Sequence, residues 1–406
     1  MIKKLCIIIA VILSFITGRY IAINYFNNSN DEKVSNVHKD KKDEFETKVD
    51  KMSLYEKIGQ LIIAGFDGTT ADDEVKSLIS EVKVGGVILF SRNVENASQV
   101  VKLNNDIKEM NKENKYPIFI SVDEEGGLVS RMPSEFKDIP TSMDIAKFND
   151  EDLSYDIGKV IGKEITSLGF NMDFAPVLDI NSNPDNPVIG KRSFGDNEEI
   201  VSKLGIATMR GLKDSDVIAT VKHFPGHGDT DVDSHVGLPV VKNDLKRLKS
   251  FELVPFKKAI DAGVDMVMVS HIMLPKVDEK NPATLSKTIV TDILRKDMNY
   301  DGVVVTDDMT MGAIINNYDI GDAAVKSINA GADIVMVCHK LDNVTVVRDA
   351  IKEAVKNGTI TEKRLNKSVE RILKLKNKYN IQDGVTEEPN VNEINDKISS
   401  VLEKMK

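Results

Sequence analysis

The fold of this chain is decided by residues 266–306, MVMVSHIMLPKVDEKNPATLSKTIVTDILRKDMNYDGVVVT. This stretch opens with the apolar run 266–270, continues through an amphipathic stretch at 288–296, and closes with the apolar run 302–306. Short runs rich in β-branched residues that alternate with amphipathic stretches are typical of parallel strands joined by crossover helices. The stretch therefore predicts one strand–helix–strand unit of a parallel sheet.

Similar apolar runs recur on both sides of this unit, at residues 60–66, 86–90, 118–122, 172–178, 217–221 and 333–337. Helical patterns between the runs cover residues 151–168, 244–262 and 341–357. Eight strand-plus-helix units close a (β/α)8 barrel, whereas an open doubly wound sheet usually has fewer strands and a Gly-rich phosphate turn. We therefore predict a single α/β domain, a TIM-type (β/α)8 barrel, over residues 51–381.

The first residues of the chain carry a targeting pattern. Two lysines at positions 3 and 4 precede an apolar run at 5–17, as in an export signal. No A-x-A-like cleavage site follows, and Arg19 and Tyr20 suit a membrane interface. Residues 1–26 are therefore either a signal peptide or an N-terminal membrane anchor. Both alternatives place the domain outside the cell or on the outer face of the cytoplasmic membrane.

Two further segments flank the predicted barrel. Residues 27–50 are charged and polar with little apolar periodicity, which predicts a solvated linker. Residues 382–406 form a C-terminal tail in which Ile394, Ile398 and Val401 recur at helical spacing. We expect a short helix there, either docked or free.

Composition limits the classes of partner. A hydrophobic content of 41% and a charged content of 29% are those of a globular chain. The net charge of −10 gives no long-range attraction for nucleic acid, so we expect no such partner. Cys6 lies in the N-terminal apolar run, so Cys338 has no partner for a disulfide within the barrel. We expect a monomer that binds a small neutral or mixed ligand.

Polar residues follow five of the predicted strands. The residues are Asp123, Glu124 and Glu125 after the third run, Asp179 after the fourth, Lys222 and His223 after the fifth, His271 after the sixth, and Asp307 and Asp308 after the seventh. In a parallel barrel these strand ends meet at one face, where active sites of such barrels lie. Helix capping explains one such residue but not five convergent strand ends.

The loop 222–235, KHFPGHGDTDVDSH, holds three of the chain's six histidines. A calcium loop counted from Asp229 would need Gly and Glu where Ser234 and Val240 stand. The histidine spacing matches no helical or cysteine-based zinc pattern. An acid/base role fits better, because the Asp233 carboxylate can accept the N–H of the His235 imidazole, raise its basicity and fix its tautomer.

This loop resembles the signature of bacterial β-N-acetylglucosaminidases of glycoside hydrolase family 3, in which a histidine with an aspartate partner replaces the usual carboxylic acid/base. The resemblance extends over residues 53–379. Its other motifs are VDEEGG-x-V-x-R at 122–131, NMDFAPVLDIN at 171–181, GKRSFG at 190–195, MVMVSHIM at 266–273 and VVVTDDM at 303–309.

The resemblance implies a retaining exo-acting β-N-acetylhexosaminidase with Asp307 as nucleophile, His235 as acid/base and Asp233 as the partner of His235. It also implies a set of residues that hold the hydroxyls and the acetamido group of the terminal sugar: Asp123, Arg131, Arg192, Lys222 and His223. Neither a metal nor a cofactor is implied. Retaining hydrolysis needs an attacking carboxylate and a proton donor, which this set supplies.

One motif departs from the family pattern. Where the family commonly reads D-Q-E-G-G-R, residues 123–128 read DEEGGL, which adds an acid and loses an arginine. This difference concerns substrate detail rather than the catalytic groups.

The expected reaction is removal of a terminal GlcNAc from peptidoglycan fragments. Three alternatives remain open. An imidazole acid/base does not repel anions, so phosphate could replace water and make the protein a phosphorylase. A β-glucosidase of the same family is the second, and a membrane-tethered sugar-binding protein is the third. The last predicts a damaged site, but Asp307, Asp233 and His235 are all present. We expect Asp308 to be a structural acceptor, and Asp179 and His271 either to brace the site or to touch sugar.

Overall fold

The computed structural model describes residues 43–234 and 237–406. It divides the chain into two compact units, Met1–Thr47 and Lys48–Lys406, and the second contains the fold. The predicted signal or anchor at 1–26, most of the linker at 27–50, and His235 lie outside the described residues. The prediction of a solvated linker is wrong for its described end, because residues 44–50 form a helix in which Val49 is buried. Among the helices of the described ranges, none is long and apolar enough to cross a membrane.

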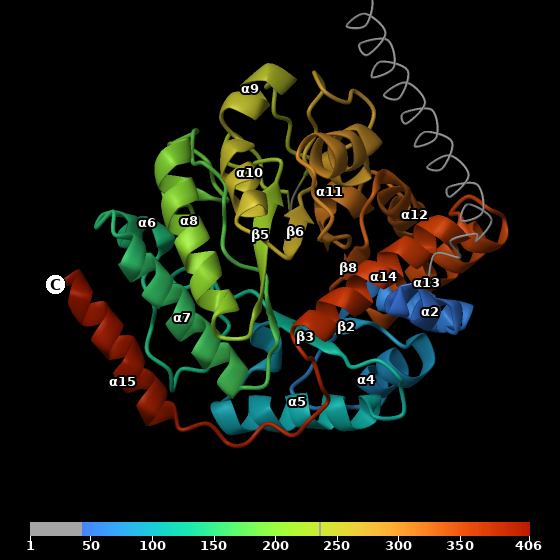
Figure 1. The fold of residues 1–406 in the computed structure, drawn as a ribbon, viewed down its shortest axis with the longest axis horizontal. Coiled ribbons are helices and arrows are strands. Elements are labelled where there is room, and N and C mark those ends of the chain that lie inside the picture. Colours follow the sequence, from blue (N-terminus) through green and yellow to red (C-terminus); the bar gives the residue numbers. More distant parts are fainter. Residues whose placement is uncertain (1–42, 235–236) are drawn as a thin grey trace, which may run out of the picture. The chain divides into compact units, whose positions relative to one another are not determined.

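Eight parallel strands close into a barrel in chain order, and β1 pairs with β8 (Figure 1). The strands are β1 Ile62–Gly65, β2 Gly86–Leu89, β3 Phe119–Val122, β4 Met172–Asp173, β5 Ile218–Phe224, β6 Met266–Val269, β7 Val303–Asp308 and β8 Ile334–Val337. Each predicted apolar run overlaps one of them, so the predicted (β/α)8 barrel is confirmed. Nearly every strand residue is buried, as expected where helices cover the outer face and side chains fill the interior.

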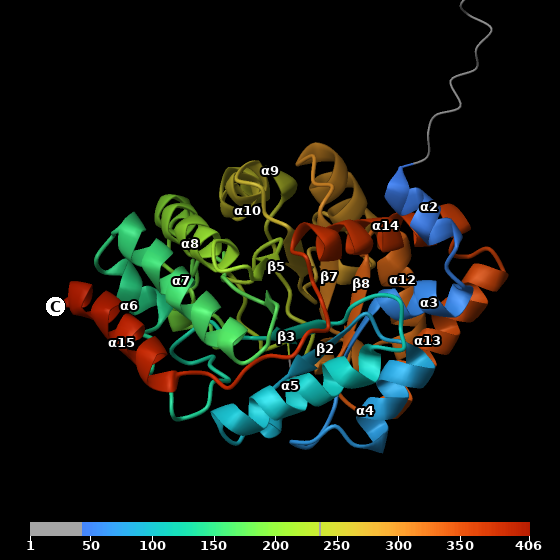
Figure 2. The same ribbon diagram turned by 60° about the horizontal axis from the view of Figure 1, so that its bottom comes forward.

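Helices cover the outside of the strands (Figures 1 and 2). The α-helices of the described residues are α2 Glu44–Asp50, α3 Leu54–Gln60, α4 Asp73–Ser77, α5 Ala97–Asn111, α6 Ser142–Ala146, α7 Glu151–Ser167, α8 Glu198–Lys213, α9 Leu245–Ser250, α10 Val254–Asp261, α11 Gly312–Ile315, α12 Ile320–Ala330, α13 Leu341–Lys356, α14 Glu362–Lys378 and α15 Val391–Leu402. The stretch predicted as a helix at 288–296 forms a π-helical segment, Thr288–Asp297.

One predicted helix is divided in two. The stretch 244–262 forms α9 and α10, with Phe251 between them outside helical geometry (φ −145°, ψ −79°). Pro255 lies in the first turn of α10, where its missing N–H costs no helical hydrogen bond. A continuous helix would have needed that N–H, so the division follows from the proline.

Three strands differ from their predicted lengths in ways that affect the site. β4 has only two residues, and Pro176, which lacks an N–H, follows shortly after. β5 and β7 instead extend beyond their predicted ends, and both shift register there. Lys222, His223 and Asp307 therefore stand on strands rather than on the following loops, which gives them a more rigid support.

The C-terminal tail is docked. After α14 the chain runs along α5, where Thr386 accepts from the Lys108 ammonium at 2.7 Å, and α15 then packs against α7 (Figure 2). Ile394, Ile398 and Val401 are the buried residues of α15, so the predicted helical spacing marks its packing face.

Candidate active site

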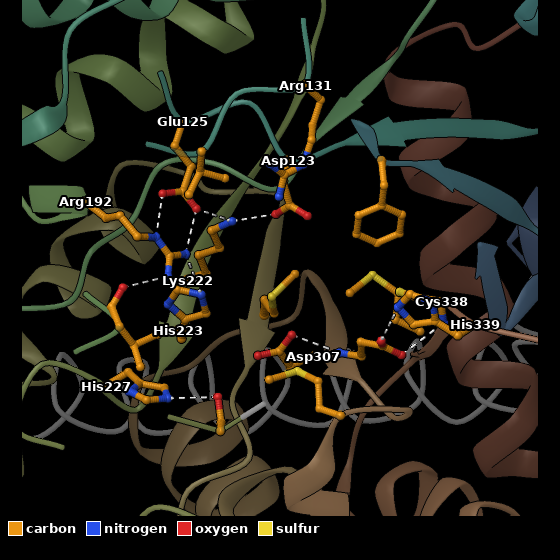
Figure 3. A pocket seen from close by; sticks show the side chains of 18 residues that line it. Asp123, Glu125, Arg131, Arg192, Lys222, His223, His227, Asp307, Cys338 and His339 are labelled. Carbon is orange, nitrogen blue, oxygen red and sulfur yellow. Dashed lines mark hydrogen bonds and ion pairs between the residues drawn. The ribbon is translucent and has the colours of Figure 1, made fainter. Parts of the chain in front are cut away.

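A cavity of about 200 Å³ opens at the carboxyl ends of the strands (Figure 3). Its lining includes all five predicted sugar-binding residues and the predicted nucleophile: Asp123, Arg131, Arg192, Lys222, His223 and Asp307. These residues are far apart in the sequence but share one space because the barrel brings the strand ends together. Asp233 is half-buried and lies outside the lining, and His235 lies outside the described residues.

One side of the cavity is a charged surface that we call the polar wall, made of Asp123, Glu125, Arg192, Lys222 and His223. The Lys222 ammonium lies 2.6 Å from Asp123 Oδ1 and 2.6 Å from Glu125 Oε1. Arg192 donates to both oxygens of Glu125, at 2.8 and 2.7 Å, which is the bidentate geometry that fixes a guanidinium. The Lys222 and Glu125 side chains are only 2% and 3% exposed, so their charges are held in place before any ligand arrives.

The charges of the polar wall support one another. Burial alone would raise the pKa of Glu125, but the positive charges of Arg192 and Lys222 outweigh it and hold this pKa well below its usual value. Burial alone would lower the pKa of Lys222, but the charges of Asp123 and Glu125 raise it. Glu125 and Lys222 are therefore ionised at neutral pH and form part of a fixed pattern of donors and acceptors.

His223 is oriented from behind by Asp179. Its Nδ1 lies 2.6 Å from Asp179 Oδ2, and its Nε2 lies 3.3 Å from the Arg192 guanidinium. An arginine can only donate, so Nε2 accepts and Nδ1 carries the proton that it donates to Asp179. Asp179 is fully buried and also accepts from the His227 N–H at 2.7 Å. Burial would raise the pKa of Asp179, but the hydrogen bonds from the His223 ring and the His227 N–H lower it. Asp179 therefore fixes the orientation of His223 in the polar wall.

The two aspartates that end β7 have different surroundings. Asp307 faces the cavity, and its Oδ1 accepts from the Asp308 N–H at 2.9 Å. Asp308 accepts at Oδ1 from the N–H groups of Thr310 (2.9 Å) and Cys338 (3.0 Å), and at Oδ2 from the Thr310 hydroxyl (2.5 Å). These bonds give Asp308 the structural acceptor role expected from the sequence.

The loop that carries Asp233 is tied to the barrel through His227. The Thr230 hydroxyl donates to the His227 carbonyl (3.0 Å), so it must accept from His227 Nδ1 (2.9 Å). His227 Nε2 is then left to accept from the Ser234 hydroxyl at 3.3 Å. This chain of bonds fixes Ser234, the residue that follows Asp233.

His271 braces the site from outside the cavity. It is fully buried, with Nε2 2.9 Å from the Asp308 carbonyl and Nδ1 2.7 Å from the Thr284 hydroxyl. It does not belong to the cavity lining, so of its two predicted roles the structure favours bracing.

Several lining residues were not among the predicted site residues: Phe90, Glu125, Val129, Val188, Ser234, Met268, Met311, Met336 and His339. Phe90 and His339 stack with ring centroids 6.0 Å apart and planes 23° apart. His339 comes two residues after the eighth predicted run, so the strand-end argument could have found it. The apolar residues offer no such signal. In the described ranges, no group of three or more His, Cys, Asp or Glu side chains could hold a metal ion.

Comparison with known proteins places these features in one family. Residues 53–375 match the model of the "Glycosyl hydrolase family 3 N terminal domain". Beta-hexosaminidase A of Pseudoalteromonas piscicida is 37% identical over 334 residues, which are 76% of this chain and 56% of that protein. A beta-hexosaminidase of Neisseria meningitidis serogroup C is 35% identical over 296 residues, 71% of this chain and 81% of that protein.

A solved structure shows the same likeness in three dimensions. A glycoside hydrolase family 3 beta-N-acetylglucosaminidase from Paenibacillus sp. str. FPU-7 is 42% identical with a TM-score of 0.82, covering 87% of this chain and 69% of that one. This chain thus spans only about half of the Pseudoalteromonas relative and about two thirds of the Paenibacillus structure.

Proposed function

Because the chain belongs to glycosyl hydrolase family 3, we propose that it is a retaining exo-β-N-acetylglucosaminidase, a β-N-acetylhexosaminidase that removes a terminal non-reducing GlcNAc. One observation carries the proposal. A carboxylate at a strand end, Asp307, faces the same small cavity as a prearranged set of ionised sugar-binding groups. Such a cavity suits the end of a glycan rather than its middle.

The proposed reaction has two steps. Asp307 attacks the anomeric carbon, a proton donor gives its proton to the leaving oxygen, and a covalent glycosyl-enzyme forms. The donor, now a base, takes a proton from water, which attacks the anomeric carbon and releases the sugar and Asp307. We assign the donor role to His235 and the partner role to Asp233. Their sequence spacing supports this assignment, and the bond between His227 and Ser234 fixes the residue that lies between them in the sequence.

The polar wall and Arg131 would bind the sugar. The Asp123 and Lys222 side chains, joined at 2.6 Å, offer an acceptor and a donor to adjacent hydroxyls. Arg131 lines the cavity, and its buried Nε donates to no protein atom within the described residues. A buried N–H of this kind is costly unless it finds an acceptor, and a sugar hydroxyl or acetamido oxygen would supply one.

We further propose that the substrate is a peptidoglycan fragment and that the protein acts as an exported monomer. The lysines and apolar run of residues 1–26 support export, and the missing cleavage site supports retention at the membrane. Cell fractionation with N-terminal sequencing tests this. A soluble extracellular form that begins after residue 17 would reject anchoring, and a full-length cytoplasmic form would reject export.

The activity is tested with aryl-GlcNAc and aryl-glucoside substrates, each with and without inorganic phosphate. We expect rapid release from aryl-GlcNAc, slow release from aryl-glucoside, and free GlcNAc as the product in both buffers. GlcNAc 1-phosphate as the product would identify a phosphorylase, and preference for the glucoside would identify a β-glucosidase. Binding of GlcNAc without cleavage would leave a sugar-binding protein.

A further inference from the structure

Glu124 lies behind the polar wall, at the start of the turn formed by residues 124–131, which we call the β3 turn. Its carboxylate accepts two backbone hydrogen bonds, from the Gly126 N–H to Oε1 (3.2 Å) and from the Arg131 N–H to Oε2 (2.8 Å). Its own N–H donates to Asp173 Oδ1 on β4 at 2.9 Å. One side chain therefore ties the first residues of the turn to its last residue and lies against the barrel.

The β3 turn carries part of the candidate site. Glu125, Val129 and Arg131 all line the cavity, and Figure 3 shows Glu125 beside Arg192. Glu125 in turn holds Arg192 and Lys222. If this turn opened, the Arg131 side chain would move, and so would Glu125, which holds the cations of the polar wall in place.

Glu124 is surrounded mainly by other acids. Arg131 is the cation that faces it from its own turn, and the Ser130 hydroxyl also donates to it. Asp173 on β4 and Glu164 on α7 are its acidic neighbours, while Asp123 and Lys222 act on Asp173. In the described part of the chain, Asp173 Oδ2 and Glu164 Oε2 are buried without a hydrogen-bond partner.

Burial raises the pKa values of all three acids. Burial raises the pKa of Glu124 to about 7, against the opposing effect of the bonds from the turn and the charge of Arg131. Burial raises the pKa of Asp173 and of Glu164 well above the usual range, and neighbouring acids add to the shift. The charge of Glu124, which alone of these acids bonds to the two ends of the β3 turn, therefore changes near neutral pH.

The charge of Glu124 decides how well it can close the turn. An ionised carboxylate accepts at both oxygens, which is what two converging N–H groups require. A protonated carboxyl carries its proton on one oxygen. That oxygen would either direct its own O–H toward the backbone N–H or accept a weaker hydrogen bond from it.

We propose that Glu124 is a positioning residue that holds the β3 turn closed in its ionised form, and thereby sets the pH range in which the site binds GlcNAc. The inference rests on the proposed function for the identity of the sugar. It also gives a role to the departure noted in the sequence, where the family commonly has Gln. An amide resembles the protonated acid, with one acceptor and one donor, so this chain has a charge-dependent closure that a Gln cannot provide.

The test is the dissociation constant of GlcNAc, measured by calorimetry between pH 5.5 and 8.5 for three proteins. The wild type should bind about tenfold more weakly at the acid end of this range. Glu124→Gln should bind GlcNAc over the whole pH range as weakly as the wild type does at pH 5.5. Its dissociation constant should show no step, that is, no change near pH 7. Glu164→Gln is the matched control, because it makes the same substitution in the same buried group without a bond to the turn. It should keep the step.

Three outcomes would overturn the proposal: no step in the wild type, a step that persists in Glu124→Gln, or a step that disappears equally in Glu164→Gln. A protein that neither binds GlcNAc nor cleaves its aryl glycoside at any pH would instead reject the proposed function. Hydrogen–deuterium exchange then tests the turn by itself. Corrected for intrinsic exchange, the amides of residues 126–131 should be about tenfold less protected at pH 6 than at pH 8. Equal protection would reject the closure, even if Glu124→Gln fails to fold.

Discussion

Two clusters of buried charge lie at opposite ends of this barrel. At the carboxyl ends, Glu125 holds Arg192 and Lys222 along the cavity. At the amino end, Asp333, the residue before β8, is fully buried and contacts Arg295, Arg364 and Arg371. Both central carboxylates have lowered pKa values, because their cations outweigh the effect of burial.

The clusters differ in what else their cations contact. Arg295 also donates to the Gly331 carbonyl at 3.1 Å, and Arg364 donates to the Ile328 carbonyl at 2.9 Å. The amino-end cluster therefore fastens α14 and the π-helical segment to the end of α12. The polar wall instead faces a cavity that also contains Asp307. Carboxylates with strongly lowered pKa values occur at both ends of the barrel. Such a pKa therefore indicates an active site only where a cavity and a reactive group are also present.

The largest expected effect is a loss of turnover without a loss of stability. Asp307→Ala should lower turnover of aryl-GlcNAc by a factor on the order of 10⁴ or more, since the proposed nucleophile is lost. The thermal midpoint should stay within a few degrees of the wild type. Intact-mass spectrometry with a slow fluorinated substrate should place the covalent label on Asp307. A label on another carboxylate would contradict the assignment.

The reverse pattern is expected at the amino end. Asp333→Asn should lower the free energy of unfolding by about 3–5 kcal/mol, because three partly buried arginines lose their shared anion. Urea unfolding measures this change. The KM of the folded protein for aryl-GlcNAc should match that of the wild type, and a raised KM would mean that the two ends are coupled.

The stabilising effect of Asp333 should also appear in how the free energy of unfolding depends on pH. The folded-state pKa of Asp333 is about 2, below the value of an unfolded aspartate, so its ionised form stabilises the fold. This contribution is complete above about pH 4 and is lost as the pH falls toward 2. Between pH 5 and pH 2 the wild type should therefore lose about 2 kcal/mol more unfolding free energy than Asp333→Asn. Parallel curves for the two proteins would rule this out.

The smallest effect tests geometry within the polar wall. Arg192→Lys keeps the positive charge but cannot make the bidentate contact with Glu125. We expect the KM for aryl-GlcNAc to rise about tenfold, with stability changed by less than about 1 kcal/mol. An unchanged KM would show that charge alone is enough at this position.

The sequence was sufficient to predict the barrel because strand and helix periodicities are local signals. It could not predict that β5 and β7 would extend through Lys222 and Asp307, because a register shift depends on the neighbouring strand. The strand-end argument together with the family resemblance predicted residues that the structure brings together in one cavity. Neither predicted the role of Glu125, which forms an ion pair with Arg192 at a sequence separation of 67 residues. The neighbouring pair of Lys222 and Asp123 has a sequence separation of 99 residues. Such pairing exists only once the barrel has closed.

On its barrel side the cavity is closed by Met268 and Met336, which are 2% and 3% exposed. At the other end of the barrel, Lys376 donates to Gln60, Gly85 and Pro117 and lies 4.5 Å from the Phe119 ring, so described side chains fill that end as well. Under the proposed function, a sugar that enters the cavity leaves through the same opening. Each released GlcNAc would then delay binding of the next glycan end, and turnover would depend on product release as well as on bond cleavage.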